Sequence, residues 1–160
     1  MRRFTPRLCL SLLLLLAMAS GLAHASETLA QVVADQQLHG YHSTQSALLR
    51  LRQAGDVPGP DAPVNERLHY QTVLLAIATD GVRLDQIRAN LDSLQKMDAD
   101  GECPPCRFYA LLAQATLEMN EVSVSAARPY LDRAAALLPE IADPLARENL
   151  LAKRGALGMV

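Results

Sequence analysis

The chain has 160 residues, half of them hydrophobic, and a formal net charge of −2. It contains four Tyr, two Phe and no Trp, so aromatic platforms for stacking nucleic-acid bases or sugars are scarce. A weakly acidic chain without a long basic run is a poor candidate for binding nucleic acid or an anionic membrane surface. Alanine and leucine dominate the composition, which favours helices over strands.

Residues 1–25 have the pattern of a secretory signal peptide. Three arginines precede an apolar run over residues 8–22, and small residues stand at Ala23 and Ala25, where a signal peptidase reads the chain. The run is short for a transmembrane helix, which needs about 20 apolar residues. We therefore predict cleavage between Ala25 and Ser26, a periplasmic or secreted location and no stable membrane insertion afterwards. An uncleaved anchor is the alternative.

Cleavage would leave residues 26–160 as one domain with a formal net charge of −5, because 12 Lys and Arg would remain against 17 Asp and Glu. Apolar side chains recur in this domain at helical spacing, as in Leu84, Ile87, Leu91 and Leu94. The sequence predicts no sheet and about seven helices, near residues 27–38, 43–54, 64–79, 83–97, 105–119 and 124–138 and from Asp143-Pro144 onward. The Pro- and Gly-rich segment 55–63 is the longest predicted loop.

Two sequence registers recur along these predicted helices. Leu-Leu-Ala occurs at residues 74–76, 111–113 and 150–152, each time in the first helix of a predicted antiparallel pair. In the second helices, leucines recur every 40 residues, at Leu51, Leu91 and Leu131. A repeat in alternating helices predicts stacked hairpins that bury their apolar faces against one another. We expect three hairpins and the opening helix of a fourth.

Residues 127–139 resemble the second helix of a tetratricopeptide (TPR) repeat. That family's spacing of small, large, small and proline residues is met by Ala127, Leu131, Ala134 and Pro139. The match to the first helix is partial, since Thr116 stands where the family usually has an aromatic residue, and only residues 109–139 match well. The resemblance implies an all-α, TPR-like array whose first helices line a concave face that commonly binds peptides.

The same resemblance implies which polar side chains face that groove. If Ala113 and Ala152 occupy the family's small-residue position, the residues that turn toward the groove are Arg107, Gln114, Asn149 and Lys153. The arginine and lysine would hold a carboxylate, and the two amides would hydrogen-bond a peptide backbone. An ordinary solvated helix face is the alternative interpretation of these four residues.

A signal peptide before diverged hairpins, with the phrases Leu137-Leu138-Pro139 and Ala142-Asp143-Pro144, is also similar to the periplasmic input regions of bacterial membrane-bound diguanylate cyclases. Those proteins continue into a transmembrane segment and a catalytic domain. This resemblance implies a sensory role. It leaves two alternatives open, a free-standing module and a truncated piece of a larger signalling protein.

The motif Cys103-Pro104-Pro105-Cys106 precedes a predicted helix and could carry redox chemistry, because a helix N-terminus favours the thiolate form of a cysteine. Exported compartments are oxidising, so we favour a structural disulfide between Cys103 and Cys106. The alternative is a periplasmic thiol-disulfide protein, although the predicted helices lack the βαβ context of that activity. We predict no metal site, since neither a second cysteine pair nor a nearby histidine completes one.

No Ser/His/Asp arrangement, pair of carboxylates or glycine-rich phosphate loop stands out in the sequence. We therefore predict neither catalysis nor a cofactor. The hypothesis from sequence is an exported, non-catalytic, TPR-like module that binds a protein or peptide or provides sensory input.

Overall fold

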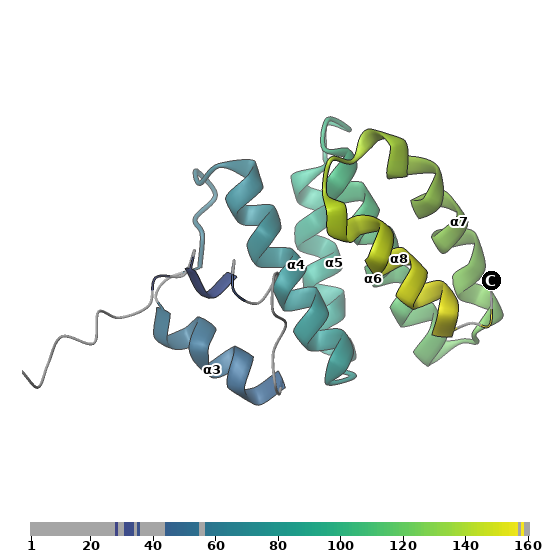
Figure 1. Ribbon diagram of the computed structural model, residues 1–160, viewed down its shortest axis with the longest axis horizontal. Coiled ribbons are helices and arrows are strands. Elements are labelled where there is room, and N and C mark those ends of the chain that lie inside the picture. Colours follow the sequence, from purple (N-terminus) through teal and green to yellow (C-terminus); the bar gives the residue numbers. More distant parts are fainter. Residues whose placement is uncertain are drawn as a thin grey trace, which may run out of the picture.

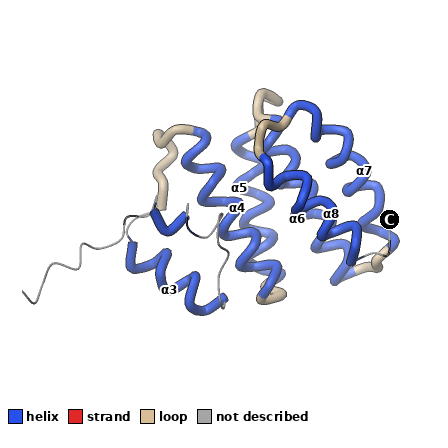
Figure 2. The backbone as a smooth tube through the Cα atoms, in the orientation of Figure 1, coloured by secondary structure: helices blue, strands red, loops and turns tan. Residues whose placement is uncertain are grey.

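The structure is a computed structural model, and it describes residues 28, 31–33, 35, 44–54, 57–156 and 158 (Figure 1). These residues form helices joined by turns and loops, without a strand, so the prediction of an all-α fold is confirmed (Figure 2). The helices are α3 (Thr44–Ala54), α4 (Val64–Asp80), α5 (Leu84–Met97), α6 (Pro104–Glu121), α7 (Arg128–Leu137) and α8 (Pro144–Ala156), with short 3₁₀ segments at Ser125–Ala127 and Leu138–Glu140.

The predicted N-terminal features fall mainly outside this description. The predicted signal peptide, residues 1–25, lies outside the described residues. Of the helix expected near residues 27–38, only residues 31–33 and 35 are described as helical. None of the described helices is long and apolar enough to cross a membrane.

Each helix packs against the next one along the chain, and α6 also contacts α4. Short turns at residues 81–83 and 122–124 reverse the chain, so consecutive helices run antiparallel (Figure 1). Glycines stand at two of the connections: Gly81 follows the last residue of α4, and the loop between α5 and α6 contains Gly101, whose φ of 74° lies in the left-handed region that favours glycine. The turn at residues 122–124 contains neither glycine nor proline. The fold therefore contains helical hairpins packed side by side.

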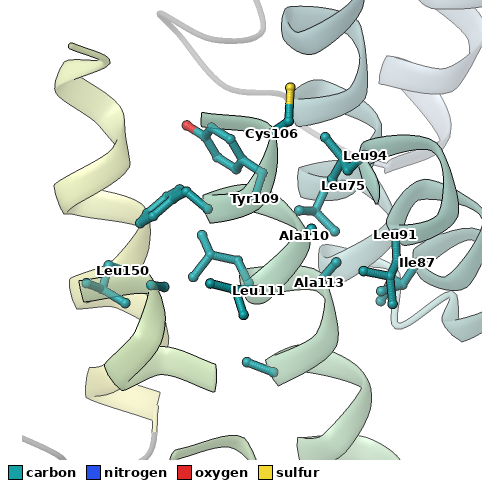
Figure 3. Close-up of a cluster of buried hydrophobic side chains, with 14 of the residues drawn as sticks. Leu75, Ile87, Leu91, Leu94, Cys106, Tyr109, Ala110, Leu111, Ala113 and Leu150 are labelled. Carbon is teal, nitrogen blue, oxygen red and sulfur yellow. The ribbon is translucent and has the colours of Figure 1, made fainter. Parts of the chain in front are cut away.

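Helix α6 is the centre of the larger apolar core. Figure 3 shows Leu111 of α6 among core side chains that come from the flanking helices, including Leu75 of α4, Ile87 of α5 and Leu150 of α8. Helix α4 also faces a smaller cluster, in which Ile77 packs with residues from α3 and from the segment before it. Because α4 contributes to both clusters, it links the first described helices to the rest of the stack.

The leucines that recur every 40 residues are all buried, although they lie in two different apolar clusters. Leu51, Leu91 and Leu131 lie in α3, α5 and α7, and all three side chains are buried. Because these three leucines are buried in alternate helices, an apolar residue is needed at each position, which is consistent with their 40-residue spacing in the sequence. It accounts for hairpin packing without requiring the exact TPR pattern, which remains a prediction.

Candidate functional site

Helices α4, α6 and α8, the first helices of successive predicted hairpins, border a groove of about 370 Å³, which we call the first-helix groove. Its lining residues are Thr72, Leu75, Ala76, Thr79 and Asp80 of α4, Tyr109 and Leu112 of α6, and Asn149, Ala152 and Lys153 of α8. Apolar and small side chains make up much of this surface, and polar groups stand among them. Such a combination is typical of sites that bind an organic ligand or a peptide.

Helical spacing explains how α6 contributes its wall of the groove. Tyr109, Leu112 and Thr116 are three and four residues apart, so they lie along one face of the helix. On α8, Asn149 and Lys153 are also four residues apart and share a face. The two faces meet across the groove, where polar side chains connect the helices.

A hydrogen bond from Tyr109 fixes the start of α8 to α6. The Tyr109 hydroxyl donates to Asp143 Oδ2 at 2.5 Å, and Asp143 Oδ1 accepts from the backbone N–H of Leu145 at 2.9 Å. Asp143 therefore caps the N-terminus of α8 while it holds the buried tyrosine. Burial and the neighbouring Asp143 carboxylate raise the pKa of Tyr109 well above its ordinary value, so the phenol stays protonated.

Lys153 of α8 contacts Thr116, a buried residue of α6 that lies outside the groove lining. Its Nζ donates to Thr116 Oγ1 at 2.7 Å, and the Thr116 hydroxyl in turn donates to the carbonyl of Leu112 at 2.8 Å. Lys153 forms no ion pair with any described residue. Partial burial lowers the pKa of Lys153 to about 8, so the side chain is mostly charged at neutral pH. It is a cation without a carboxylate partner in the described part of the chain.

The structure brings together two of the four predicted groove residues, Asn149 and Lys153. It places the other two, Arg107 and Gln114, in a separate depression of about 350 Å³ between α5, α6 and α7. Arg107 and Tyr109 are two residues apart, which turns them about 200° from each other around the helix axis. The four residues therefore do not share one groove.

The two alanines that set the expected register differ in their surroundings. Ala113 is completely buried in the core, whereas Ala152 is exposed and lines the first-helix groove. Ala113 lies in α6, which packs against helices before and after it, whereas Ala152 lies in the last described helix.

Arg107 is engaged at the corner where α5 leads into α6. Its Nε donates to Asp98 Oδ2 at 2.8 Å, and its Nη2 donates to Asp98 Oδ1 at 3.2 Å and to the carbonyl of Gly101 at 2.8 Å. Asp98 Oδ1 also accepts from the backbone N–H of Cys103 at 2.9 Å. Burial of Asp98 opposes its ionisation, but these hydrogen bonds and the Arg107 charge outweigh burial and hold the pKa of Asp98 below its ordinary value.

The predicted disulfide between Cys103 and Cys106 is confirmed at the same corner. Cys103 is the N-cap of α6 and is partly exposed, and its Sγ accepts from the backbone N–H of Cys106 at 3.3 Å. Cys106 is completely buried beside the apolar core (Figure 3). Two prolines fill the first turn of α6, where the absence of an N–H costs little. We call Asp98, Cys103, Cys106 and Arg107 the α6 corner.

Sequence reasoning placed Asp143 at the start of the last helix, but it gave Asp143, Tyr109 and Thr116 no part in joining α6 to α8. The signal for Asp143 was present, because an aspartate directly before a proline that opens a helix is typical of an N-cap. Thr116 was visible as a departure from the TPR pattern, and a hydroxyl in an otherwise apolar helix face indicates a hydrogen-bond partner. The partner of Tyr109 depends on how α8 packs, which short-range patterns do not specify.

Among the described residues, no three His, Cys, Asp or Glu side chains gather closely enough to hold a metal ion. Comparison with known proteins finds no matching protein-family model, no matching curated protein and no matching solved structure.

Proposed function

We propose that the chain is an exported, non-catalytic helical module that binds a protein or peptide, either on its own or as the sensory part of a larger signalling protein. The observation that supports this proposal is Lys153, a partly buried cation that borders a groove and has no carboxylate partner among the described residues. Partial burial works against its charge, so folding alone does not explain a lysine at this position.

The groove offers contacts that suit an extended peptide with a carboxylate. Lys153 provides a positive charge, and Asn149 on the next turn of α8 provides an amide that can pair with a peptide backbone. Leu75, Leu112 and Ala152 provide apolar surface between the helices for a side chain of the peptide. A terminal carboxylate or an acidic side chain would replace the neutral Thr116 hydroxyl as the main partner of Lys153.

Selection from a library of random peptides with free carboxyl termini tests this proposal. We expect enriched peptides to bind the purified protein with a dissociation constant of about 1–100 μM. Lys153→Met keeps most of the side-chain volume but removes the charge, and it should weaken binding about tenfold or more. Amidation of the peptide terminus should have a similar effect if that terminus is the carboxylate that binds.

The matched control is Arg147→Met, which removes a positive charge from an exposed position of the same helix outside the groove. It should leave peptide affinity unchanged. Failure to enrich any peptide, or equal affinity of wild type and Lys153→Met for the enriched peptides, would contradict binding through the first-helix groove.

Export is a separate part of the proposal and has its own test. It rests on the arginines, apolar run and small residues of residues 1–25. Expression of the full chain in a Gram-negative bacterium, followed by cell fractionation and intact-mass measurement, should give a periplasmic product that begins at Ser26. A full-length product that stays in the cytoplasm or membrane fraction would argue against export by a cleaved signal.

The α6 corner supports a second candidate function, thiol–disulfide exchange with another protein. The specific observation is a disulfide at a helix N-terminus whose first sulfur, that of Cys103, is partly exposed and accepts a backbone N–H. In such an exchange a dithiol substrate would lose two electrons and two protons to form its own disulfide, and Cys103 and Cys106 would become thiols. Equilibration with glutathione measures the reduction potential, and a value below about −300 mV would mark the bond as structural.

A further inference from the structure

A cavity of about 310 Å³ lies on the other side of α4 from the first-helix groove, and its lining residues do not overlap with those of the groove. The segment before α4 contributes Pro58 and Pro60, α4 contributes Arg67, and α5 contributes Lys96. No aspartate or glutamate is among the residues that line it. We call this space the α4–α5 cavity.

Both basic side chains of the α4–α5 cavity lack an acidic partner. Neither Arg67 nor Lys96 forms an ion pair with a described residue. Arg67 is partly buried, and its Nε is enclosed by protein without a hydrogen-bond partner. Because the Nε is enclosed, a ligand in the cavity would meet the terminal NH₂ groups of the Arg67 guanidinium rather than the Nε.

The orientation of Gln71 adds a third donor. The side-chain amide of Asn90, a buried residue of α5, donates to the Gln71 carbonyl at 2.9 Å and to Gln71 Oε1 at 2.7 Å. The side-chain oxygen of Gln71 therefore already accepts one hydrogen bond, and its NH₂ group remains as a donor. Ser93 donates its hydrogen to the carbonyl of Ala89 at 2.9 Å and offers no further donor. Arg67, Gln71 and Lys96 thus each bring N–H donors to the cavity.

The other lining residues are mostly apolar. They are Pro58, Pro60, Met97, Tyr70, whose side chain ends in a hydroxyl, and Ser93. A bare inorganic anion would use the donors but would leave these apolar walls without a contact. A compact organic anion would use both surfaces, because apolar contact and charge-assisted hydrogen bonds then act on one molecule.

We propose that the α4–α5 cavity binds a small monocarboxylate with a compact apolar body. The Arg67 guanidinium pairs with the carboxylate, Lys96 adds a second positive charge and the Gln71 amide donates a further hydrogen bond. The prolines and Met97 cover the apolar body of the ligand. This ligand site goes beyond the peptide groove, since it lies on another face of α4 and would serve the sensory rather than the protein-binding part of the proposed function.

The test uses the purified protein and three probes of similar size or charge: benzoate, the neutral amide benzamide and inorganic phosphate. Backbone amide chemical shifts measured by NMR report both affinity and place. We expect benzoate to bind with a dissociation constant of about 1 mM and to shift amide signals around Gln71 and Met97. Benzamide and phosphate should each bind about tenfold more weakly, since each lacks one of the two contacts.

Arg67→Met should weaken benzoate binding about tenfold or more, because it removes the charge and keeps the aliphatic stem. Lys96→Met should weaken it by a smaller factor, since Lys96 is exposed. Arg147→Met, on the exposed face of α8, is the matched control and should leave binding unchanged. Far-UV circular dichroism checks folding, and if Arg67→Met does not fold, Lys96→Met carries the test.

The proposal would be overturned if benzoate did not bind up to about 50 mM, which is far above the expected dissociation constant. It would also be overturned if benzamide bound as tightly as benzoate. The same holds if the folded variants Arg67→Met and Lys96→Met bound benzoate as tightly as wild type. Phosphate binding as tight as that of benzoate would also overturn it, because the apolar walls would then contribute nothing. None of these outcomes depends on the first-helix groove, so a failure here is distinguishable from a failure of peptide binding.

Discussion

Two basic side chains expected to face one groove, Arg107 and Lys153, lie in opposite electrostatic settings. Arg107 belongs to the α6 corner, where its guanidinium makes three hydrogen bonds, two of them to the Asp98 carboxylate. Lys153 donates one hydrogen bond to a neutral hydroxyl and forms no ion pair with a described residue. One charge has a carboxylate partner within the fold, and the other has none among the described residues.

The difference indicates what each residue contributes. A partly buried carboxylate such as Asp98 needs donors, and Arg107 with the Cys103 N–H provides them, so this charge network stabilises a loop. The setting of Lys153 lowers its pKa and therefore disfavours its charged form. We infer that the α6 corner serves the fold and that the groove lysine serves binding.

The largest expected effect comes from breaking the charge network of the α6 corner with Asp98→Ala. This change removes the acceptor of three hydrogen bonds and leaves Arg107 and the Cys103 N–H without their partner. We expect the free energy of unfolding to fall by about 3 kcal/mol in urea denaturation. Asp92→Ala, at an exposed position of α5, is the matched control and should change stability by less than about 0.5 kcal/mol.

The same variant tests the pH dependence of the corner. Because the pKa of Asp98 is lowered in the folded protein, its contribution is present above the ordinary pKa of 3.8 and is lost as the pH falls through the folded value. Wild type should therefore lose stability faster than Asp98→Ala on acidification below about pH 4. Parallel pH profiles for the two proteins would show that the carboxylate is not stabilised by its neighbours.

The next largest effect is expected from reduction of the disulfide. A bond between Cys103 and Cys106 closes a loop of only four residues, which in a chain-entropy model stabilises the fold by about 2 kcal/mol. A phosphine reductant should lower the free energy of unfolding by that amount, and the double variant Cys103→Ala/Cys106→Ala should not respond to it. Because the bond belongs to the corner, reduction should leave the titration of Lys153 unchanged.

Sequence patterns predicted the described helices because both their apolar faces and their ends are local. Burial of Leu51, Leu91 and Leu131 in alternate helices reproduces the 40-residue period that indicated hairpin packing. Prolines and glycines mark most of the turns, and Pro104 starts α6 within one residue of the expected position. The disulfide was also predictable, since its two cysteines are close in sequence and fit the first turn of a helix.

The candidate site was only half predictable because it depends on which face of α6 each neighbour covers. Spacing along α8 placed Asn149 and Lys153 together, but the register between α6 and α8 was taken from the positions of Ala113 and Ala152. Ala113 is a core residue, and the α6 residues that line the groove are Tyr109 and Leu112. Helix-to-helix rotation is a property of tertiary packing, and one sequence does not specify it.

A smaller effect, of opposite sign to those at the corner, is expected from Lys153→Met. The pKa of Lys153 is lower in the folded protein, about 8, than in the unfolded chain, near 10.5, so protonation favours unfolding. Removing the charge should raise the free energy of unfolding by about 1–2 kcal/mol at pH 7, less than the full shift implies because the side chain is only partly buried. Urea denaturation between pH 7 and 11 checks this expectation.

The pH profile gives the sign of this prediction a second check. Wild type should gain stability relative to Lys153→Met as the pH rises from about 8 to 10.5, because the buried amine loses its proton over that range. Above it the difference between the two proteins should be smaller. A destabilised Lys153→Met with a constant difference from wild type would mean that the lysine serves the fold as Arg107 does, and it would remove the contrast between the two regions.

The smallest effect is expected from Thr116→Val, which replaces the hydroxyl that accepts from Lys153 with a methyl group of similar size. Loss of a hydrogen bond to the charged form should lower the pKa of Lys153 below about 8 and change stability by about 1 kcal/mol or less. The Lys153 side-chain NMR signal, followed against pH, measures this directly. Gln114→Ala, on the opposite side of α6, should leave that titration unchanged because Gln114 hydrogen-bonds to Glu118 instead. If the pKa of Lys153 were the same in Thr116→Val and in wild type, burial alone would determine the protonation of Lys153. The Thr116 hydroxyl would then not position the ammonium group of Lys153 for a ligand.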